Sequence, residues 1–194
     1  MPPGQLLLDN LACIRGGRLL FKDVSCAVGA SEALLVHGRN GAGKSSLLRI
    51  IAGLLEPVMG RVDSSGRIAL ADEANALDPR LPLRRALGFW AALDGSNGVA
   101  IDGAMEAMQI GHLAAVPVRM LSTGQKKRAT LARVIASGAD VWLLDEPGNG
   151  LDAQSLTLLD GIMASHRTRG GIIIAASHQP IGLADAKTIL IGEP

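Results

Sequence analysis

Residues 38–46 combine glycines with a lysine and two serines at a spacing suited to phosphate chemistry. In order they are Gly38, Arg39, Asn40, Gly41, Ala42, Gly43, Lys44, Ser45 and Ser46. Glycines allow a concave turn whose backbone N–H groups converge on phosphate oxygens. Lys44 is expected to reach the β- and γ-phosphates of a nucleotide, and the Ser45 hydroxyl to bind Mg²⁺. We call these residues the phosphate loop; the alternative is an ordinary glycine-rich turn before a helix.

Two carboxylates form a second candidate group. Residues 141–144 are entirely hydrophobic, and Asp145 and Glu146 come directly after them. A buried parallel strand delivers side chains at its carboxyl end, where open α/β sheets bind ligands. Asp145 is expected to hold Mg²⁺, directly or through water, and Glu146 to polarise a water that attacks the terminal phosphate. The alternative is an acidic loop between a strand and a helix.

Strands must place both groups at one edge of a sheet. Continuous apolar runs, which are typical of strands covered on both faces, occur at 33–37, 141–144 and 171–176. Residues 6–28 predict two short strands around Gly16 and Gly17, and 61–71 predicts a further strand pair.

Helical patterns alternate with these strands. They cover 47–55, 122–135 and about 155–165, and mixed helical periodicity occupies 79–118. Strands that alternate with helices indicate an α/β fold with a mainly parallel core sheet. A small antiparallel β part precedes that sheet, and a compact helical insertion covers about 79–135.

The composition narrows the class of protein. Hydrophobic residues make up 48% of the chain, yet the longest stretch without a charged residue, 170–184, contains His178 and Pro180. No segment is therefore expected to span a membrane. The net charge of +1 gives no electrostatic case for nucleic acid, and the basic triplet 126–128 is interpreted as a solvated helix end. The two cysteines, Cys13 and Cys26, are expected to be small buried residues of a cytosolic protein.

A third motif lies between the first two. It reads Leu121, Ser122, Thr123, Gly124 and Gln125. This run resembles the Leu-Ser-Gly-Gly-Gln signature of ABC-type ATPases, with Thr123 in place of the first glycine. The resemblance implies that Ser122 and Gly124 begin a helix whose amino end binds the γ-phosphate held by a second ATPase subunit. By itself, such a run before a helix is an ordinary cap.

Two further segments match the same family. The loop Asn149, Gly150, Leu151 and Asp152 resembles the loop that crosses the ATPase dimer interface, and His178 follows the third apolar run as the family's switch histidine does. The resemblance covers the chain and implies one P-loop domain of ABC type over 1–194. It implies ATP and Mg²⁺ as ligands, with Lys44, Glu146 and His178 acting in hydrolysis.

The chain departs from the family at two positions. Where the family stacks adenine on an aromatic residue, this sequence has Cys13, Ile14 and Arg15, so either Arg15 stacks by its guanidinium plane or the base is held loosely. Phe21 is expected to be a core residue. Where the family uses a glutamine near Mg²⁺, Glu73 or Asp72 is a candidate oxygen ligand, and a solvated loop is the alternative.

The chain most resembles the haem-export ATP-binding subunits of bacterial cytochrome c biogenesis, and the resemblance is carried by residues 47–54, 121–128 and 142–147. That resemblance implies membrane-embedded permease partners beside the helical insertion, a second ATPase subunit, no nucleic acid, and haem only as an indirect partner. It implies a peripheral place on the cytoplasmic face of the inner membrane. The alternatives are an exporter of another small substrate, a soluble ABC-type ATPase in cofactor assembly, or a nucleotide-gated module without activity.

Overall fold

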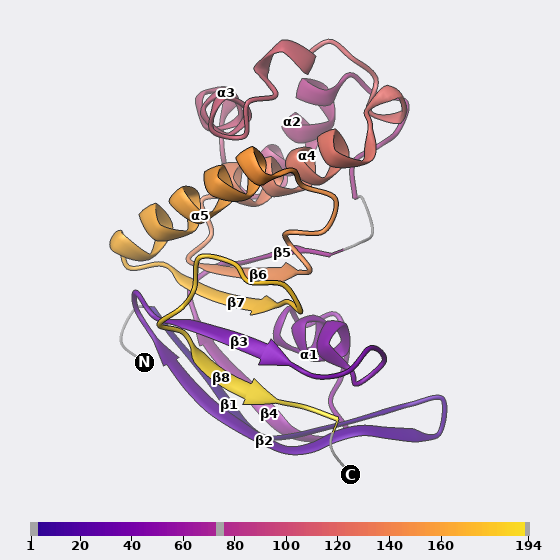
Figure 1. Cartoon of the computed structure of the whole chain (residues 1–194), viewed down its shortest axis with the longest axis vertical. Coiled ribbons are helices and arrows are strands. Elements are labelled where there is room, and N and C mark those ends of the chain that lie inside the picture. The colour runs from indigo at the N-terminus through magenta and orange to yellow at the C-terminus, as the bar shows by residue number, and fades with distance from the viewer. Residues whose placement is uncertain (1–3, 73–75, 193–194) are drawn as a thin grey trace.

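Five strands form a parallel sheet through the middle of the molecule (Figure 1). The structure is a computed structural model that describes residues 4–72 and 76–192. Every residue of strands β6 (Val141–Asp145) and β7 (Ile172–Ala176) is buried, as expected for a sheet that is covered on both faces. In spatial order the strands are β5 (Ile68–Ala71), β6, β7, β3 (Ala33–His37) and β8 (Lys187–Leu190).

A second, antiparallel sheet is built from the N-terminal part of the chain. Its order is β2 (Arg18–Gly29), β1 (Gln5–Arg15) and β4 (Met59–Ser65). Gly16 and Gly17 form the hairpin turn with φ values of 55° and 76°, which side chains disfavour. The predicted hairpin is therefore confirmed.

The prediction of a strand pair over 61–71 is only half right. Both strands exist, but β4 pairs with β1 in the antiparallel sheet, whereas β5 pairs with β6 in the parallel sheet. Their composition explains the division. The polar residues of β4 suit a partly exposed sheet, and the Ile-Ala-Leu-Ala run of β5 suits a strand beside buried β6. Strand β8 was not predicted.

Helices cover the two faces of the parallel sheet. Helix α1 (Lys44–Ile51) places Leu47 and Leu48 in a core that it shares with both sheets. Helices α4 (Thr123–Ala136) and α5 (Ala153–Thr168) pack on the other face. Because both faces are covered, the carboxyl ends of the strands remain as the edge at which side chains meet a ligand.

A helical subdomain lies at one end of the molecule (Figure 1). It contains α2 (Leu83–Leu93), α3 (Gly98–Ala107) and the short 3-10 turns Gly111–Leu113 and Val118–Met120. Met105, Met108 and Ile110 are buried in its interior.

Across residues 4–72 and 76–192, we find no helix with the length and apolar character that a membrane span requires.

The cysteines differ from each other in burial. Cys13 is buried as expected, but Cys26 is only half-buried, so the expectation of two buried thiols was wrong for Cys26. Cys26 lies on β2, an outer strand of the antiparallel sheet, and both thiols are free. Burial raises the pKa of each thiol above its usual value.

A buried histidine stacks on a tryptophan at the end of the parallel sheet opposite the phosphate loop. The rings of His166 and Trp142 lie 3.8 Å apart with planes 10° from parallel. His166 is 7% exposed, and burial lowers its pKa below the usual 6.5 because the charged imidazolium loses solvation. Backbone groups of Asp140 and Ile172 oppose this shift only in part.

Acidification is expected to destabilise the fold through His166. Because the unfolded chain takes up the proton first, the unfolding free energy falls by up to about 1.4 kcal/mol per pH unit below about pH 6.5, until the folded pKa is reached. Urea unfolding between about pH 8 and pH 5.5 measures this slope. His166→Gln should remove this part of the slope, and replacement of the exposed His112 by Gln should not. Equal slopes in the wild type and His166→Gln would contradict the prediction.

Candidate active site

Three neighbouring strands deliver the predicted site residues to one cleft. The phosphate loop follows β3, Asp145 ends β6, and His178 lies just after β7. These strands are adjacent and parallel, so their carboxyl ends meet at one edge of the sheet. The cleft there has a volume of about 400 Å³. Its lining includes Lys44, Ser45, Asp145, Glu146, Asn149 and His178.

The phosphate loop requires glycine at its turns. Gly43 has a φ of 106°, and a Cβ there would lie 3.1 Å from the side chains of Leu20 and Phe21. A Cβ on Gly38 would lie 2.6 Å from the carbonyl oxygen of Ile191. Larger residues at these positions would push the loop away from the sheet, so the glycines hold its backbone close to the strand ends.

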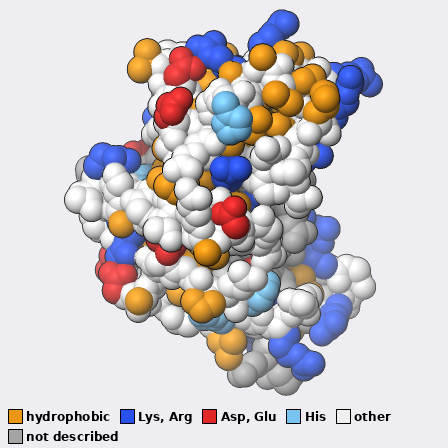
Figure 2. All heavy atoms as spheres, turned by 45° about the horizontal axis from the view of Figure 1, so that its top comes forward, with side chains coloured by type: hydrophobic (Ala, Val, Ile, Leu, Met, Phe, Trp, Pro, Cys, Tyr) orange, Lys and Arg blue, Asp and Glu red, His pale blue; other side chains and the backbone are white. Residues whose placement is uncertain are grey.

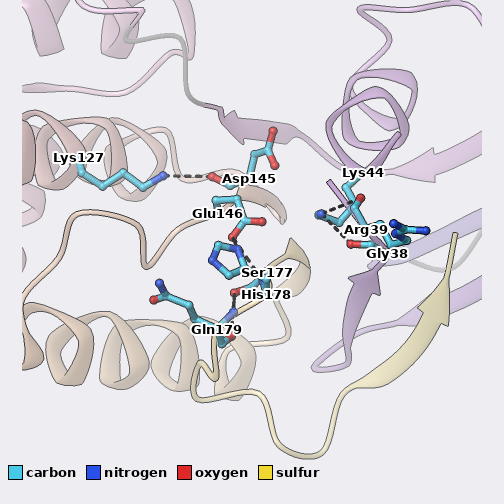
Figure 3. Close-up of polar contacts among 9 residues, drawn as sticks. All are labelled: Gly38, Arg39, Lys44, Lys127, Asp145, Glu146, Ser177, His178 and Gln179. Carbon is cyan, nitrogen blue, oxygen red and sulfur yellow. Dashed lines mark hydrogen bonds and ion pairs between the residues drawn. The ribbon is translucent and has the colours of Figure 1, made fainter. Parts of the chain in front are cut away.

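Lys44 begins α1 and folds back over the phosphate loop. Its ammonium donates to the carbonyl oxygens of Gly38 at 2.9 Å and Arg39 at 3.5 Å. Only 8% of Lys44 is exposed. Figure 3 shows this ammonium across the cleft from Asp145, Glu146 and His178. The loop therefore offers a positive charge and the N-terminal N–H groups of α1 to the same space.

Glu146 is held in an unusual backbone conformation. Its φ is 45°, in the left-handed region that non-glycine residues rarely adopt. Its N–H donates to the carbonyl oxygen of Ala176 at 2.8 Å. The His178 Nδ1 lies 2.8 Å from the Glu146 Oε2, so the imidazole and the carboxylate form one unit at the ends of β6 and β7 (Figure 3). A carboxylate fixed in this way is suited to accept a proton from water.

Oxygen donors in the cleft fit Mg²⁺. Ser45 provides a hydroxyl and Asp145 a carboxylate, and Mg²⁺ is usually held by one or two such groups together with phosphate oxygens and water. Within the described parts of the chain, no group of three or more His, Cys, Asp or Glu side chains is arranged to bind a metal by itself. The candidate ligand Glu73 lies outside the described residues. Asp72, the other candidate, forms an ion pair with Arg49 at 3.4 Å.

The signature residues 121–125 are not among the residues that line the cleft. Ser122 caps α4 by accepting a hydrogen bond from the Gln125 N–H at 3.3 Å, while Gln125 Oε1 accepts from the Ser122 N–H at 2.9 Å. A Cβ on Gly124 would lie 3.0 Å from the carbonyl oxygen of Gly150. The signature turn and the loop 149–152 therefore pack together, and one chain does not place its signature on its own phosphate loop.

The residues near the position expected for the adenine of ATP are partly as predicted. Phe21 is 4% exposed, which confirms that it is a core residue. Arg15 is exposed near the hairpin turn, and the stacking of its guanidinium on adenine stays a prediction. Leu20 lines the cleft and was missed, because its spacing in the sequence is that of an ordinary strand residue.

The interpretation of 126–128 as a solvated helix end was wrong for two of its residues. Lys127 Nζ donates to the carbonyl oxygen of Asp145 at 3.1 Å, and Arg128 donates to the carbonyl oxygen of Met108 at 3.4 Å. Helix α4 lies against the sheet, so long side chains on its inner side reach backbone carbonyl oxygens. Because every residue has such an oxygen, the sequence does not reveal these contacts. One feature of the sequence could have indicated the Lys127 contact: Lys127 lies one turn into the predicted helix that precedes the strand ending in Asp145.

Comparisons with known proteins point to one family. A family model described as "ABC transporter" matches residues 21–149. The cytochrome c biogenesis ATP-binding export protein CcmA of Sphingopyxis alaskensis is 54% identical, and the match covers 96% of each chain. That of Zymomonas mobilis is also 54% identical, over 95% of this chain and 83% of the relative.

Solved structures share the fold. The ATP-binding subunit of an ABC transporter has a TM-score of 0.84 at 22% identity, over 96% of this chain and 85% of that chain. An ABC transporter ATP-binding protein from Pyrococcus furiosus has a TM-score of 0.83 at 21% identity, over 96% of this chain and 97% of that chain.

Proposed function

This chain belongs to the ABC transporter family, and we propose that it is the ATP-hydrolysing subunit of an exporter that drives haem handling in cytochrome c biogenesis. Relatives with that named role are 54% identical over nearly the whole chain. The observation that carries the enzymatic part is the meeting of Lys44, Asp145, Glu146 and His178 in one cleft. The part that concerns cytochrome c biogenesis is supported by the names of these relatives, which are ATP-binding export proteins of cytochrome c biogenesis, and haem enters as the group that c-type cytochromes carry.

Each side chain has a distinct role in the proposed hydrolysis. Lys44 neutralises charge on the β- and γ-phosphates while the bond between them breaks. Glu146 orients the attacking water and accepts its proton, and His178 keeps the Glu146 carboxylate directed into the cleft. Mg²⁺ bound by Ser45 and Asp145 would supply further positive charge beside the phosphates.

A second copy of the chain completes the site in this proposal. The signature turn is separated from the chain's own phosphate loop, while the N-terminus of α4 is suited to contact an anion. Two copies would place each signature turn on the ATP held by the other copy. The γ-phosphate then favours the closed pair, and its loss on hydrolysis lets the pair reopen.

The permease partners of this ABC exporter subunit are proposed to dock on the helical subdomain. Figure 2 shows hydrophobic side chains gathered over this part of the molecule with Lys and Arg around them. Phe89 and Leu93 of α2 are 59% and 66% exposed, and Val99 of α3 is 81% exposed. Phe89 also lines a groove of about 310 Å³ with Leu77 and Leu81. Exposed apolar groups gathered in this way are typical of protein interfaces.

A complementation experiment tests the proposed function. In a strain that lacks the gene, the wild-type chain should restore covalently haem-loaded c-type cytochromes. Phe89→Asp should retain the ATPase activity of the purified chain but fail to restore cytochromes, because it places a charge in the docking surface. Leu54→Asp is the matched control, since Leu54 is 69% exposed outside this surface.

Normal cytochrome levels in the deleted strain would reject the role in cytochrome c biogenesis. That result would favour export of another small substrate or a soluble role in cofactor assembly. Full complementation by Phe89→Asp would reject the docking surface and leave the ATPase assignment in place.

A further inference from the structure

The peptide bond between Asp145 and Glu146 has both of its polar atoms held by hydrogen bonds. On one side, the Glu146 N–H donates to the carbonyl oxygen of Ala176 at 2.8 Å. On the other side, the carbonyl oxygen of Asp145 accepts from Lys127 Nζ at 3.1 Å (Figure 3). The first bond joins neighbouring strand ends, whereas the second reaches across from helix α4. The orientation of this peptide plane therefore depends on a side chain from another element.

This peptide plane matters because it precedes Glu146. The φ of 45° at Glu146 is unfavourable for a residue with a Cβ, and such conformations persist only where their surroundings hold them. A rotation of the plane toward an ordinary negative φ would move the Glu146 N–H away from Ala176. It would also change the direction of the carboxylate that contacts His178 at 2.8 Å.

We propose that Lys127 is a positioning residue for hydrolysis: it holds the Asp145–Glu146 peptide and thereby the direction of the Glu146 carboxylate. Asp145 and Glu146 are 3% and 9% exposed, so little water is available to replace the ammonium at this carbonyl. The carbonyl accepts a charge-assisted bond there, which is stronger than a bond between neutral groups. The inference rests on the proposed ATPase function and names how its general base is kept in place.

The position of Lys127 on α4 also connects the two halves of the composite site. The same helix begins at Ser122 with the signature turn, which is proposed to contact ATP held by the other copy. A shift of α4 on that contact would move the Lys127 ammonium relative to the Asp145 carbonyl. The direction of Glu146 would then depend on whether the signature turn is engaged.

The test compares Lys127→Met, Lys127→Arg and Lys126→Met in the full chain. Lys127→Met retains a long, unbranched side chain but cannot donate, so kcat is expected to fall about tenfold to a hundredfold, in line with the cost of misplacing a reacting group by about 1 Å. The KM for ATP and the thermal unfolding midpoint are expected to change little. Lys127→Arg should recover much of the rate, because it can donate to the same carbonyl. Lys126→Met removes the same charge from the neighbouring position and should keep wild-type kcat.

Other results would overturn the proposal. A rise in KM with unchanged kcat would place Lys127 in nucleotide binding instead. Equal losses in Lys127→Met and Lys126→Met would indicate a general effect of charge on α4. Wild-type kcat in Lys127→Met would show that the peptide needs no side-chain support, while a wild-type chain without ATPase activity would reject the proposed function itself.

A further test combines Lys127→Met with a change of the general base, Glu146→Gln. The loss caused by Lys127→Met should be much smaller when Glu146 is already Gln, because a positioning residue has little effect once its target is inactive. Single-turnover measurements with excess protein detect the slow residual rates. A loss of the same factor in both backgrounds would overturn the proposal.

Discussion

Glu146→Gln is expected to bind ATP normally and to lose about 10²–10⁴-fold in turnover, which is the usual contribution of a positioned general base. The amide has nearly the same shape as the carboxylate but cannot take a proton from the attacking water. Glu146 lies at the carboxyl end of β6, and its Oε2 is 2.8 Å from the Nδ1 of His178. The phosphate loop is on the other side of the cleft and stays unchanged in the variant.

Glu146→Gln is also expected to accumulate as a closed dimer with ATP bound. Because ATP remains intact in the variant, its γ-phosphate should keep two copies closed on each other. Size-exclusion chromatography with ATP should show a dimer for Glu146→Gln and a smaller dimer fraction for the wild type. Asp185→Asn is a suitable control, since Asp185 is an exposed carboxylate paired with Arg167 away from the cleft. Turnover close to wild type in Glu146→Gln would remove Glu146 from the role of base.

Lys44→Ala is expected to weaken ATP binding by about tenfold to a hundredfold, which corresponds to the loss of one or two hydrogen bonds to charged phosphates. The Lys44 ammonium is nearly buried at the phosphate loop, where its charge is weakly screened by solvent. The same variant should lose hydrolysis even at saturating ATP. This variant lacks the positive charge that would stabilise the phosphate oxygens as the terminal bond breaks.

Two measurements separate binding from folding in Lys44→Ala. Calorimetric titration with ATP gives the dissociation constant, and the thermal midpoint without nucleotide shows whether the loop still folds, since Lys44 also bonds to Gly38 and Arg39. Arg61→Ala removes the same charge at a 70% exposed position on β4 and should bind ATP like the wild type. Wild-type affinity in Lys44→Ala would contradict the proposed role of the phosphate loop.

Local sequence was sufficient for the parts of the site that depend on backbone conformation. Glycines at 38, 41 and 43 permit turns with positive φ that other residues disfavour, and an uninterrupted apolar run such as 172–176 favours a strand buried on both faces. These preferences act over a few residues. The parallel sheet, its three central strands and the antiparallel hairpin were therefore predicted correctly.

Contacts between distant parts of the chain escaped prediction. The partition of β4 and β5 between two sheets depends on which strand edge each one meets, and the stacking of His166 on Trp142 depends on how α5 packs. Lys127 looked like one of three solvated basic residues until the fold placed it beside Asp145.

The sequence by itself predicted a phosphate site in this protein, because a glycine-rich turn with Lys44 and a strand that ends in Asp145 and Glu146 depend on local geometry. The tertiary structure alone decided that Glu146 adopts a positive φ and is held by groups from β7 and α4. It also left the signature residues outside the lining of the cleft of the same chain. The physical reason is that a hydrogen bond depends on positions and angles in space, which only the packing of distant segments determines.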